Sequence, residues 1–361
     1  LPVHSSLSGK IADIRPWPHP LGPDVPSIIV ESDGRDEWVS DATGREDYFR
    51  LSPEEIREIV KSAGIAGLGG AAFPTHVKLT PPEDCEIDTV ILNGCECEPY
   101  LTCDHRLMLD YPMEILEGLK IIMQTLDAER GIVAVEANKP DAISLLEKQI
   151  RREPSLELAV LKVKYPQGAE KHLIDAILKR KVPPGKLPLH VGIVVDNVGT
   201  AFAIRQAVRR GIPLVERVIT VTGSGIKQPQ NLWVRLGTLF GDVISQCGGL
   251  RENPEKIIAG GPMMGIAQYT LDVPVVKGTS GILILAEAKT FAEGECIRCG
   301  KCIDACPVNL MPTAMAQRVK SKDWVGLKRY SPLECMECGS CAYVCPAKIP
   351  LVQYIKWGKE E

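Results

Sequence analysis

The amino-acid sequence predicts a multidomain α/β protein, and three observations carry that prediction. Between residues 88 and 210, apolar strand-like runs alternate with helical patterns, which is typical of a Rossmann-like, mostly parallel sheet with helices on both faces. Beyond residue 215 the alternation is lost, and short strands separated by paired glycines indicate a compact α+β module. Two runs of four cysteines after residue 290 indicate a small C-terminal domain of a different kind.

The bulk composition narrows the possible classes of protein. A chain of 361 residues is long enough for several domains, each with its own core. The net charge of −4 and the aromatic content of 5% give no indication of a nucleic-acid-binding surface. No apolar run reaches the roughly 18 residues that a membrane-spanning helix needs, and no signal peptide is evident. The 13 cysteines indicate a reducing compartment in which thiolates persist.

Residues 1–49 are expected to form a small β module followed by a linker. A short apolar run at residues 27–30 lies among prolines and glycines, and residues 31–47 are acidic and contain glycine. Residues 1–6 look like the middle of a strand, so we expect that further residues precede Leu1 in the complete protein.

A domain of alternating strands and helices is predicted over residues 50–215. It begins with a helix, because Ser52 is a good N-cap, Pro53 suits the first turn and Glu55 completes a capping box. Gly64 is expected to end that helix. The expected strands are residues 89–92, 131–136, 156–163 and 190–195, and the expected helices are residues 113–126, 142–151, 169–179 and 199–209. Sheets of this kind bind ligands at the carboxyl ends of their strands.

Two further domains are predicted after residue 215. Residues 216–289 form the α+β module, and residues 290–361 form the cysteine-rich domain. In the α+β module, the expected strands are residues 218–221, 233–234 and 281–285. The cysteine-rich domain is expected to be helical, because residues 311–330 between its two cysteine runs have a helical pattern. Apolar residues 351–357 predict either a capping helix or a docking surface.

The two cysteine runs share the spacing Cys-x2-Cys-x2-Cys-x3-Cys-Pro, which is typical of backbone that surrounds a [4Fe–4S] cluster. In paired runs the fourth cysteine usually serves the other cluster. We therefore assign one cluster to Cys296, Cys299, Cys302 and Cys345, and the other to Cys335, Cys338, Cys341 and Cys306. The alternatives fit less well, because zinc sites use wider, two-by-two spacing and a disulfide framework would not repeat one spacing twice. Such clusters move single electrons, so the chain must also hold or meet an electron donor and an acceptor.

A glycine-rich stretch between residues 64 and 78 is the second candidate site. Four glycines would allow a ligand to approach the backbone, whose N–H groups could cradle a phosphate. These glycines are Gly64, Gly67, Gly69 and Gly70. Lys78 offers a positive charge and Phe73 a ring for stacking. The stretch lacks the Gly-Lys-Ser/Thr ending of a Walker loop, and a purely structural turn is the alternative.

Polar residues follow the expected strand 89–92, at the position where α/β folds place ligands. Asn93, Glu96 and Glu98 could hydrogen-bond to a flavin ring and a ribose, although a solvated acidic loop is the alternative. Cys95, Cys97 and Cys103 lie in the same stretch. Cys-x-Cys on an extended chain points its sulfurs to opposite faces, which favours polar packing over metal ligation.

These two motifs together resemble the NADH-binding flavoprotein subunit of respiratory complex I. The resemblance implies that the glycine loop and Lys78 hold FMN, and that Phe73 and the acidic residues face NADH. Glu170, after Gly168-Ala169, resembles that family's glutamate near the nicotinamide. Asn197 and Thr200 resemble its turn at the flavin phosphate. One departure is Cys95, which stands where the complex I flavoprotein has an aspartate.

A closer resemblance is to the C subunit of the Rnf (Rsx) ion-translocating electron-transport complex. The stretch from Asn93 to Asp104, Asn-Gly-Cys-Glu-Cys-Glu-Pro-Tyr-Leu-Thr-Cys-Asp, looks like that family's signature and includes Cys95. The resemblance implies an SLBB, ubiquitin-like module near residues 217–268, and it identifies the N-terminal β module as part of a barrel-sandwich domain.

For function, the Rnf resemblance implies an oxidoreductase that exchanges electrons between NAD(H), non-covalent FMN and the two clusters. Glu170, Phe73 and Glu98 would then act on the nicotinamide side. The implied partners are the integral membrane and iron–sulfur subunits of the complex, with ferredoxin as an indirect partner and Na+ or H+ as the coupled ion. The implied location is peripheral, at the cytoplasmic face of the bacterial inner membrane.

Two alternatives stay open at this point. A soluble cobalamin reductase of bacterial microcompartments resembles the Rnf protein and keeps the two-cluster pattern, although Tyr100-Leu-Thr-Cys-Asp104 favours Rnf. A non-catalytic electron-relay subunit with a vestigial glycine loop would contain iron and sulfide but no FMN.

Overall fold

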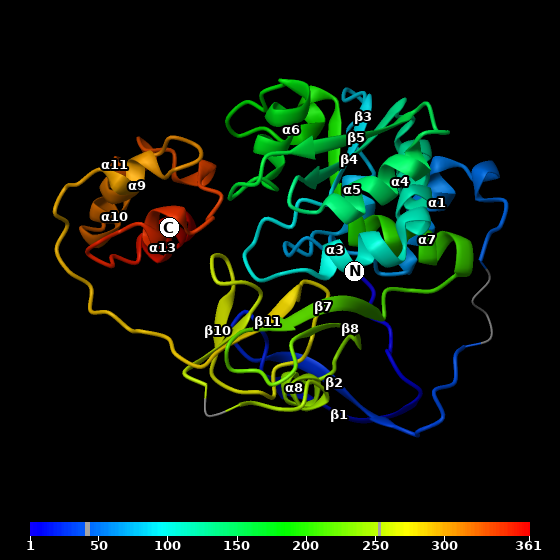
Figure 1. Ribbon diagram of the computed structural model, residues 1–361, viewed down its shortest axis with the longest axis horizontal. Helices are drawn as coiled ribbons and strands as arrows, with labels where there is room; N and C mark the ends of the chain where they lie inside the picture. The colour runs from blue at the N-terminus through cyan, green and yellow to red at the C-terminus, as the bar shows by residue number, and fades with distance from the viewer. Residues whose placement is uncertain (40–43, 252–253) are drawn as a thin grey trace. The chain divides into compact units, whose positions relative to one another are not determined.

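The computed structural model of the chain describes residues 1–39, 44–251 and 254–361 and contains two compact units (Figure 1). The first unit contains an N-terminal hairpin, a parallel sheet with its helices and a five-stranded sheet. The second unit contains both cysteine runs and comprises residues 183–186, 262–265 and 288–361. Residues 40–43 of the predicted linker and residues 252–253 of the predicted α+β module lie outside the described residues.

The N-terminal module is an antiparallel hairpin of β1 (Gly9–Trp17) and β2 (Val25–Ser32). The prediction that residues 1–6 form a strand is wrong. Polar contacts hold this segment instead, because the Pro2 carbonyl accepts a hydrogen bond from Lys277 Nζ at 2.9 Å. Ser6 Oγ likewise donates to the Leu236 carbonyl at 2.6 Å.

Helix α1 (Pro53–Ser62) confirms the predicted start and end signals. Ser52 Oγ accepts a hydrogen bond from the Glu55 N–H at 3.2 Å, and the Glu55 carboxylate accepts one from the Ser52 N–H at 2.8 Å. Gly64 follows the helix with φ of +66°, a conformation that suits glycine. The short 3-10 helix Tyr48–Arg50 precedes α1.

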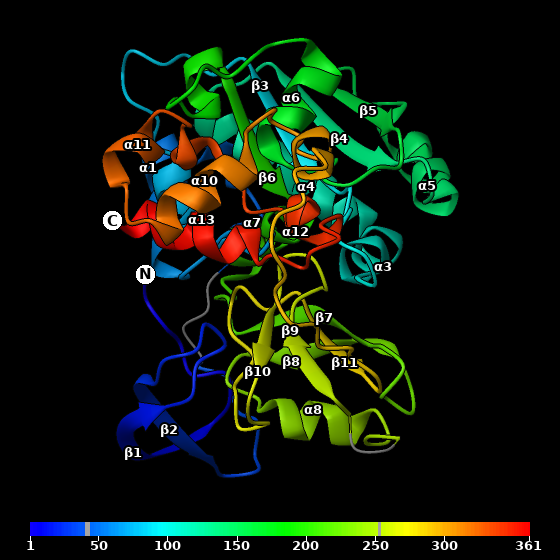
Figure 2. The same ribbon diagram turned by 90° about the vertical axis from the view of Figure 1, so that its left-hand side faces the viewer.

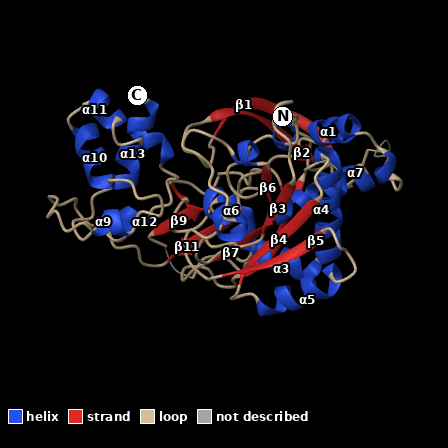
Figure 3. Cartoon of the chain, turned by 90° about the horizontal axis from the view of Figure 1, so that it is seen from above, coloured by secondary structure: helices blue, strands red, loops and turns tan. Residues whose placement is uncertain are grey.

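The central sheet consists of four parallel strands in the order β5-β4-β3-β6 (Figure 3). Their bounds are β3 (Thr89–Asn93), β4 (Arg130–Glu136), β5 (Leu156–Leu161) and β6 (Ile193–Asn197). The predicted strand at 190–195 begins later, because Pro188–Val191 forms a 3-10 turn and Gly192 is left-handed. The register pairs Asn93 with Asn197. These two polar residues therefore lie next to each other at the carboxyl edge of the sheet.

Besides α1, the described part of the parallel-sheet region contains six helices. They are α2 (Thr75–Lys78), α3 (Cys103–Asp110), α4 (Pro112–Leu126), α5 (Pro140–Ile150), α6 (Glu170–Leu178) and α7 (Val198–Arg210). Of these, α4 to α7 confirm the predicted alternation, whereas α2 and α3 were not predicted. Helices α4 and α7 share one apolar core with strands β3 and β4. They approach closely, because a Cβ at Gly118 of α4 would collide with the Ala201 carbonyl of α7.

The predicted α+β module is a five-stranded sheet in the order β10-β9-β11-β7-β8, with helix α8 (Phe240–Gln246) beside it (Figure 2). The strands are β7 (Glu216–Thr222), β8 (Gln230–Arg235), β9 (Lys256–Ala259), β10 (Ile266–Gln268) and β11 (Gly281–Leu285). Within the described part of this sheet, β11 and β7 pair in parallel and the other strand pairs are antiparallel. The buried Phe240 anchors the apolar core between the helix and the sheet.

The second unit is helical, as the sequence predicts. Its helices are α9 (Lys301–Asp304), α10 (Pro312–Lys320), α11 (Trp324–Lys328), α12 (Ser340–Tyr343) and α13 (Leu351–Glu360), with a 3-10 helix at Pro332–Glu334. The predicted helix at 311–330 is divided into α10 and α11, because Lys322 adopts a left-handed φ of +54°. Helix α13 buries Leu351, Val352 and Ile355, whereas Trp357 is 40% exposed.

Among the described residues, we find no helix with both the length and the apolar composition that crossing a bilayer requires.

Candidate functional site

The glycine loop is fixed at both ends and held from two other elements. The Gly67 N–H donates to the Phe73 carbonyl at 2.8 Å, which closes the loop on itself. The Leu68 N–H donates to Thr200 Oγ1 of α7 at 2.9 Å. Arg217 Nη2 of β7 donates to the Leu68 carbonyl at 3.0 Å. The tip of the loop is therefore held beside the N-terminus of α7.

The four predicted glycines divide between two roles. A Cβ on Gly69 would lie 3.5 Å from Asn197 Cβ, whereas one on Gly70, at φ of +106°, would meet nothing within 4 Å. Gly67 lies on the same loop. Gly64 lies elsewhere, because a Cβ there would meet the Pro2 carbonyl oxygen at 2.5 Å. The loop thus offers open backbone at Gly70, Gly69 lies in contact distance of Asn197, and Gly64 serves the end of α1.

Lys78, at the end of α2, lies in a compact group of charges. Its Nζ donates to Glu170 Oε1 at 2.7 Å and to the Val195 carbonyl at 2.6 Å. Burial lowers the pKa of Lys78, but Asp196 and Glu170 outweigh this effect and raise it overall. Burial raises the pKa of Asp196 to about 6, against the opposing effect of Lys78. Asp196 Oδ2 is buried and has no hydrogen-bond partner in the described structure.

The two asparagines at the carboxyl edge of the sheet orient the neighbouring loops. Asn93 Nδ2 donates to the Gly168 carbonyl at 2.8 Å, which fixes the turn before Glu170. Asn197 Oδ1 accepts from the Gly199 N–H at 2.8 Å and so caps α7, while its Nδ2 donates to Asp104 Oδ2 at 2.6 Å. The predicted cofactor residues Asn93, Asn197 and Thr200 are therefore brought together.

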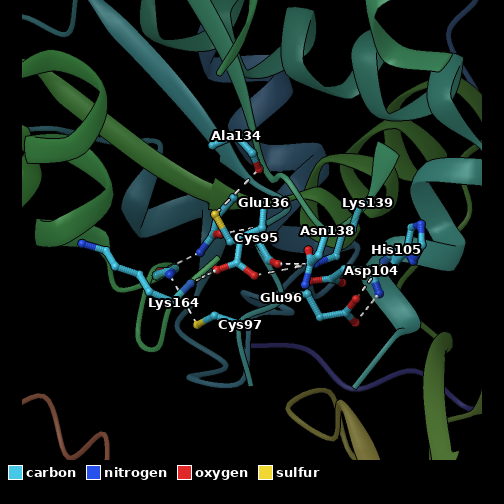
Figure 4. A network of polar contacts seen from close by, with 12 residues as sticks. Cys95, Glu96, Cys97, Asp104, His105, Ala134, Glu136, Asn138, Lys139 and Lys164 are labelled. Atoms are coloured by element: carbon cyan, nitrogen blue, oxygen red, sulfur yellow. Dashed lines mark hydrogen bonds and ion pairs between the residues drawn. The ribbon is translucent and has the colours of Figure 1, made fainter. Parts of the chain in front are cut away.

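Glu96, in the strand-end loop between β3 and α3, caps helix α3 (Figure 4). Its two carboxylate oxygens accept hydrogen bonds from the Asp104 and His105 N–H groups at 2.8 and 3.0 Å. Burial raises the pKa of both Glu96 and Asp104, and the Asp104 carboxylate raises that of Glu96 further. Asn197 and Arg217 oppose the rise of the pKa at Asp104. The cap places the α3 N-terminus beside the sheet edge, so Glu96 has a structural contribution in addition to its predicted cofactor role.

The cysteines of the strand-end loop make polar contacts within the protein (Figure 4). Cys95 Sγ lies 3.9 Å from the Ala134 carbonyl, and burial raises the pKa of its thiol. Cys97 Sγ accepts from the Gly168 N–H at 3.4 Å. Lys139 Nζ donates to the Cys95 carbonyl at 2.6 Å. These contacts agree with polar packing of the thiols.

The residues predicted to face the nicotinamide differ in exposure. Phe73 is 50% exposed at the end of the glycine loop. Glu98 is half-buried and packs against Gly261, where a Cβ would collide with its side chain. Glu170 begins α6 and contacts Lys78. Of these three residues, the structure therefore connects Glu170 directly to the charge group at the loop.

In the second unit, cysteines of the two runs lie together in two places. One cavity is lined by Cys306 of the first run together with Cys335, Cys338 and Cys341 of the second. Cys345 packs in an apolar cluster with Cys302 and Cys296 of the first run. Four convergent thiols suit an iron–sulfur cluster, so these residues fit the predicted cofactor. The cavity contains all four cysteines of one predicted set, whereas the apolar cluster also includes Cys341 and does not include Cys299. The crossed assignment of the ligands therefore stays a prediction.

Comparison with known proteins assigns a family to the chain. Residues 60–206 match the Nuo51 FMN-binding domain, residues 218–267 the SLBB domain and residues 295–349 the 4Fe-4S dicluster domain. The chain is 49% identical to the C subunit of the proton-translocating ferredoxin:NAD(+) oxidoreductase complex of Clostridium ljungdahlii, covering 99% of this chain and 79% of that protein. It belongs to the family of C subunits of ion-translocating oxidoreductase complexes.

Two further matches extend the comparison. The C subunit of the Na(+)-translocating ferredoxin:NAD(+) oxidoreductase complex of Acetobacterium woodii is 47% identical, with 100% of this chain and 82% of that protein covered. An NAD+-reducing [NiFe]-hydrogenase in the H2-reduced state is similar in fold, with a TM-score of 0.61, 19% identity, and 89% of this chain and 65% of that chain covered.

Membership of this family confirms the resemblance and the fold class that the sequence predicts. The chain is part of a multisubunit complex and contains an FMN-binding domain and a 4Fe-4S dicluster domain with eight cysteines. The three matched segments each fall within one predicted domain, although the predicted boundaries themselves stay predictions. The roles of individual residues also stay predictions.

Sequence reasoning missed two charged residues of the flavin region. Asp196 directly precedes Asn197 at the end of β6, and this position after a buried strand was the available signal. Arg217 belongs to the five-stranded sheet, far from the glycine loop in sequence. No local pattern connects Arg217 to Leu68, because only the folded chain brings them together.

Proposed function

We propose that this protein transfers electrons between NAD(H), FMN and two [4Fe–4S] clusters. The observation that carries the proposal is the position of the glycine loop. The Leu68–Thr200 hydrogen bond holds the loop beside the N-terminus of α7, and Gly70 leaves backbone open there. Helix N-termini and exposed N–H groups bind phosphate, as a flavin mononucleotide requires.

The charged residues around Lys78 also support FMN as the ligand. Lys78 is surrounded by Asp196 and Glu170, so its cation is held in place rather than free to move into solvent. A phosphate would compete for this cation through a charge-assisted hydrogen bond. Bound FMN would supply the exchange between two-electron hydride chemistry and single-electron transfer. Phe73, Glu98 and Glu170 would position the nicotinamide nucleotide.

Electrons would then pass through the second unit. We assign its eight ligands as the two crossed sets, with Cys306 and Cys345 exchanged between the runs. Because hydride exchange between nicotinamide and flavin is reversible, the same residues support either direction of flow.

For the intact complex, we propose a peripheral position at the cytoplasmic face of the bacterial membrane. The partners would be integral membrane and iron–sulfur subunits, with ferredoxin as the indirect partner. The relatives from Clostridium ljungdahlii and Acetobacterium woodii are named as parts of proton-translocating and Na(+)-translocating complexes, so the coupled ion would be H+ or Na+.

The direct test is an anaerobic NADH titration of the purified chain, followed by visible and EPR spectroscopy. We expect the flavin absorbance to bleach first and cluster signals to follow. Protein that contains iron and sulfide but no FMN would instead be an electron relay.

Cell fractionation tests the assembly. We expect the protein to sediment with membranes, and to move to the soluble fraction when the integral partner subunits are deleted. Retention on membranes that lack those subunits would indicate direct lipid attachment. A wholly soluble protein in intact cells would favour a soluble reductase such as a cobalamin reductase.

A further inference from the structure

The second unit contains an internal repeat, so the surroundings of its two clusters can be compared position by position. Each residue of the first cysteine run corresponds to a residue of the second run that follows it at the same distance along the chain as Cys335 follows Cys296. The backbone repeats with the sequence, because paired residues share unusual left-handed φ angles. These pairs are Arg298 and Glu337 (55° and 58°), Gly300 and Gly339 (78° and 81°), and Asn309 and Lys348 (55° and 53°). The two runs therefore share a backbone conformation at these positions and differ in their side chains.

The first informative difference lies at the second residue of the helix that follows each Cys-Pro. In α10 this residue is Thr313, and in α13 it is Val352. Thr313 Oγ1 lies 3.3 Å from Cys296 Sγ, and its backbone N–H hydrogen-bonds to Cys302 Sγ. Val352 lines the cavity that contains Cys335, but its side chain has no polar atom. Threonine and valine have the same shape, so the pair differs essentially in one hydroxyl group.

The second difference is a reversal of charge between Arg298 and Glu337. The backbone N–H of each residue hydrogen-bonds to the first cysteine of its run, and for Glu337 this distance to Cys335 Sγ is 3.4 Å. The side chains oppose each other, because Arg298 places a cation near Cys296 and Glu337 an anion near Cys335. Lys359 pairs with Glu337 at 2.6 Å and donates to the Cys335 carbonyl, and its charge acts on Cys335 more strongly than that of Glu337. The anion therefore lowers the benefit of Lys359 to the second cluster, whereas Arg298 near Cys296 forms no ion pair with a carboxylate of the described residues.

A third difference is solvent exposure. Cys299 is exposed, whereas its counterpart Cys338 is 7% exposed. Other contacts act in the opposite direction. The Leu310 N–H donates to Cys306 Sγ at 3.2 Å, and Ser340 Oγ lies 3.5 Å from Cys338 Sγ, where its hydroxyl can donate to a cluster thiolate. The counterpart of Ser340 is Lys301, whose positive charge again favours the first cluster environment.

We propose that the cluster held by Cys296, Cys299, Cys302 and Cys345 has the higher reduction potential of the two, and that Thr313 and Arg298 set this order. Reduction adds one electron to the cluster and its thiolates. Hydrogen-bond donors, cations and solvent stabilise the added charge, whereas a nearby carboxylate destabilises it. A single electron on the pair would then reside mainly on this first cluster. The inference rests on the proposed function in that the chain carries two clusters.

The test is a pair of reciprocal substitutions, Thr313→Val and Val352→Thr, in the full chain with both clusters loaded. EPR-monitored redox titration of the unmodified protein should give two midpoint potentials. We expect Thr313→Val to lower the higher midpoint and Val352→Thr to raise the lower one. The expected change in each reduction equilibrium is about threefold to tenfold, where tenfold corresponds to about 59 mV for a one-electron couple.

Matched variants distinguish the effect of the hydroxyl group on the midpoint potential from a general disturbance of the structure. Thr313→Ser keeps the hydroxyl and should retain the unmodified midpoint. Arg298→Gln should lower the higher midpoint, and Glu337→Gln should raise the lower one. Ser340→Ala should lower the lower midpoint by less than Thr313→Val lowers the higher one.

Failure of this inference and failure of the proposed function would give different experimental results. If Thr313→Val lowers the lower midpoint, the order is reversed and the inference is overturned. Midpoints that stay fixed in both reciprocal variants would also overturn it, provided that iron analysis shows both clusters. Absence of clusters from the unmodified protein would instead refute the proposed function.

Discussion

The second unit collects its eight cysteines from one stretch of chain between Cys296 and Cys345, whereas the candidate flavin site collects its side chains from separate segments. Lys78 follows the glycine loop, Asn93 and Asn197 end two neighbouring strands, and Glu170 begins α6. The cluster ligands can therefore be recognised by spacing alone. The flavin site exists only after the sheet has brought its segments together.

This contrast also predicts how each region responds to substitution. A cluster needs all four thiolates, so loss of one ligand should remove or convert a whole cofactor. In the flavin region many contacts are shared among loop, helix and sheet. Loss of one contact there should weaken binding by a measurable factor and leave the fold intact.

The largest effect is expected for Cys306→Ser. Cys306 lies with Cys335, Cys338 and Cys341 around one cavity, so the cluster held by the second run should be lost or converted. Iron analysis and EPR spectroscopy would measure this, with Cys85→Ser as a control outside the two runs. Disturbance of the Cys296 cluster alone would mean that each run holds its own cluster, and the crossed assignment would be wrong.

A second, smaller effect is expected in the flavin region for Lys78→Ala. Removing one charge-assisted phosphate contact should cost about 1.5–3 kcal/mol of FMN binding, which corresponds to roughly 10-fold to 150-fold weaker affinity. Gly69→Val should also lower the occupancy, because a Cβ at this position already lies 3.5 Å from Asn197. FMN content after gel filtration is the measurement.

A control variant and the cluster signals make the FMN test specific. Lys61→Ala is a matched control, because Lys61 is an exposed lysine on α1 whose side chain pairs with Glu58. Both cluster signals should persist in every one of these variants. Full flavin content in both Lys78→Ala and Gly69→Val would contradict a flavin-binding loop.

The same contrast explains how far the sequence could be interpreted. The capping box of Ser52 and Glu55 is local chemistry, and the structure reproduces it. The break at Lys322 was not predicted, because a left-handed lysine gives no signal in a helical pattern. Arg217 was missed because its partner Leu68 belongs to a distant segment. Features that depend on residues close together in the sequence, such as the capping box, can thus be predicted from the sequence. Contacts between distant segments can be found only in the folded structure.

A third prediction distinguishes the nicotinamide side of the flavin site from the phosphate side. Glu170→Gln should keep the hydrogen-bonding shape beside Lys78 but lose the negative charge. Together with Phe73→Ala, it should slow flavin reduction by NADH by about tenfold, with a smaller effect on FMN content. Stopped-flow reduction of bound flavin would measure this, with the exposed Glu147→Gln as a control. Unchanged rates in both variants would move the NADH site elsewhere in the chain.

The smallest expected effect concerns Asp196, which the flavin region buries beside Lys78 and Glu170. Burial raises the pKa of this carboxyl to about 6, Lys78 opposes the rise and Glu170 adds to it. The native state therefore binds the proton more tightly than the unfolded chain. Stability should therefore fall as pH rises from about 4 to about 6, the range between the pKa of the unfolded chain and that of the native state.

Asp196→Asn should remove this dependence, since the amide carries no titrating proton. We expect the temperature of FMN release, followed by flavin fluorescence, to fall less between pH 5 and pH 7 in the variant than in the unmodified protein. The exposed Asp175→Asn should keep the original slope. Glu96 and Asp104 have pKa values that are also raised, so they contribute a slope of the same sign in both proteins and cancel in the comparison. Equal slopes in Asp196→Asn and the unmodified protein would show that the pKa of Asp196 does not rise on folding, so that Asp196 would be an ionised carboxylate beside Lys78 over this whole range of pH.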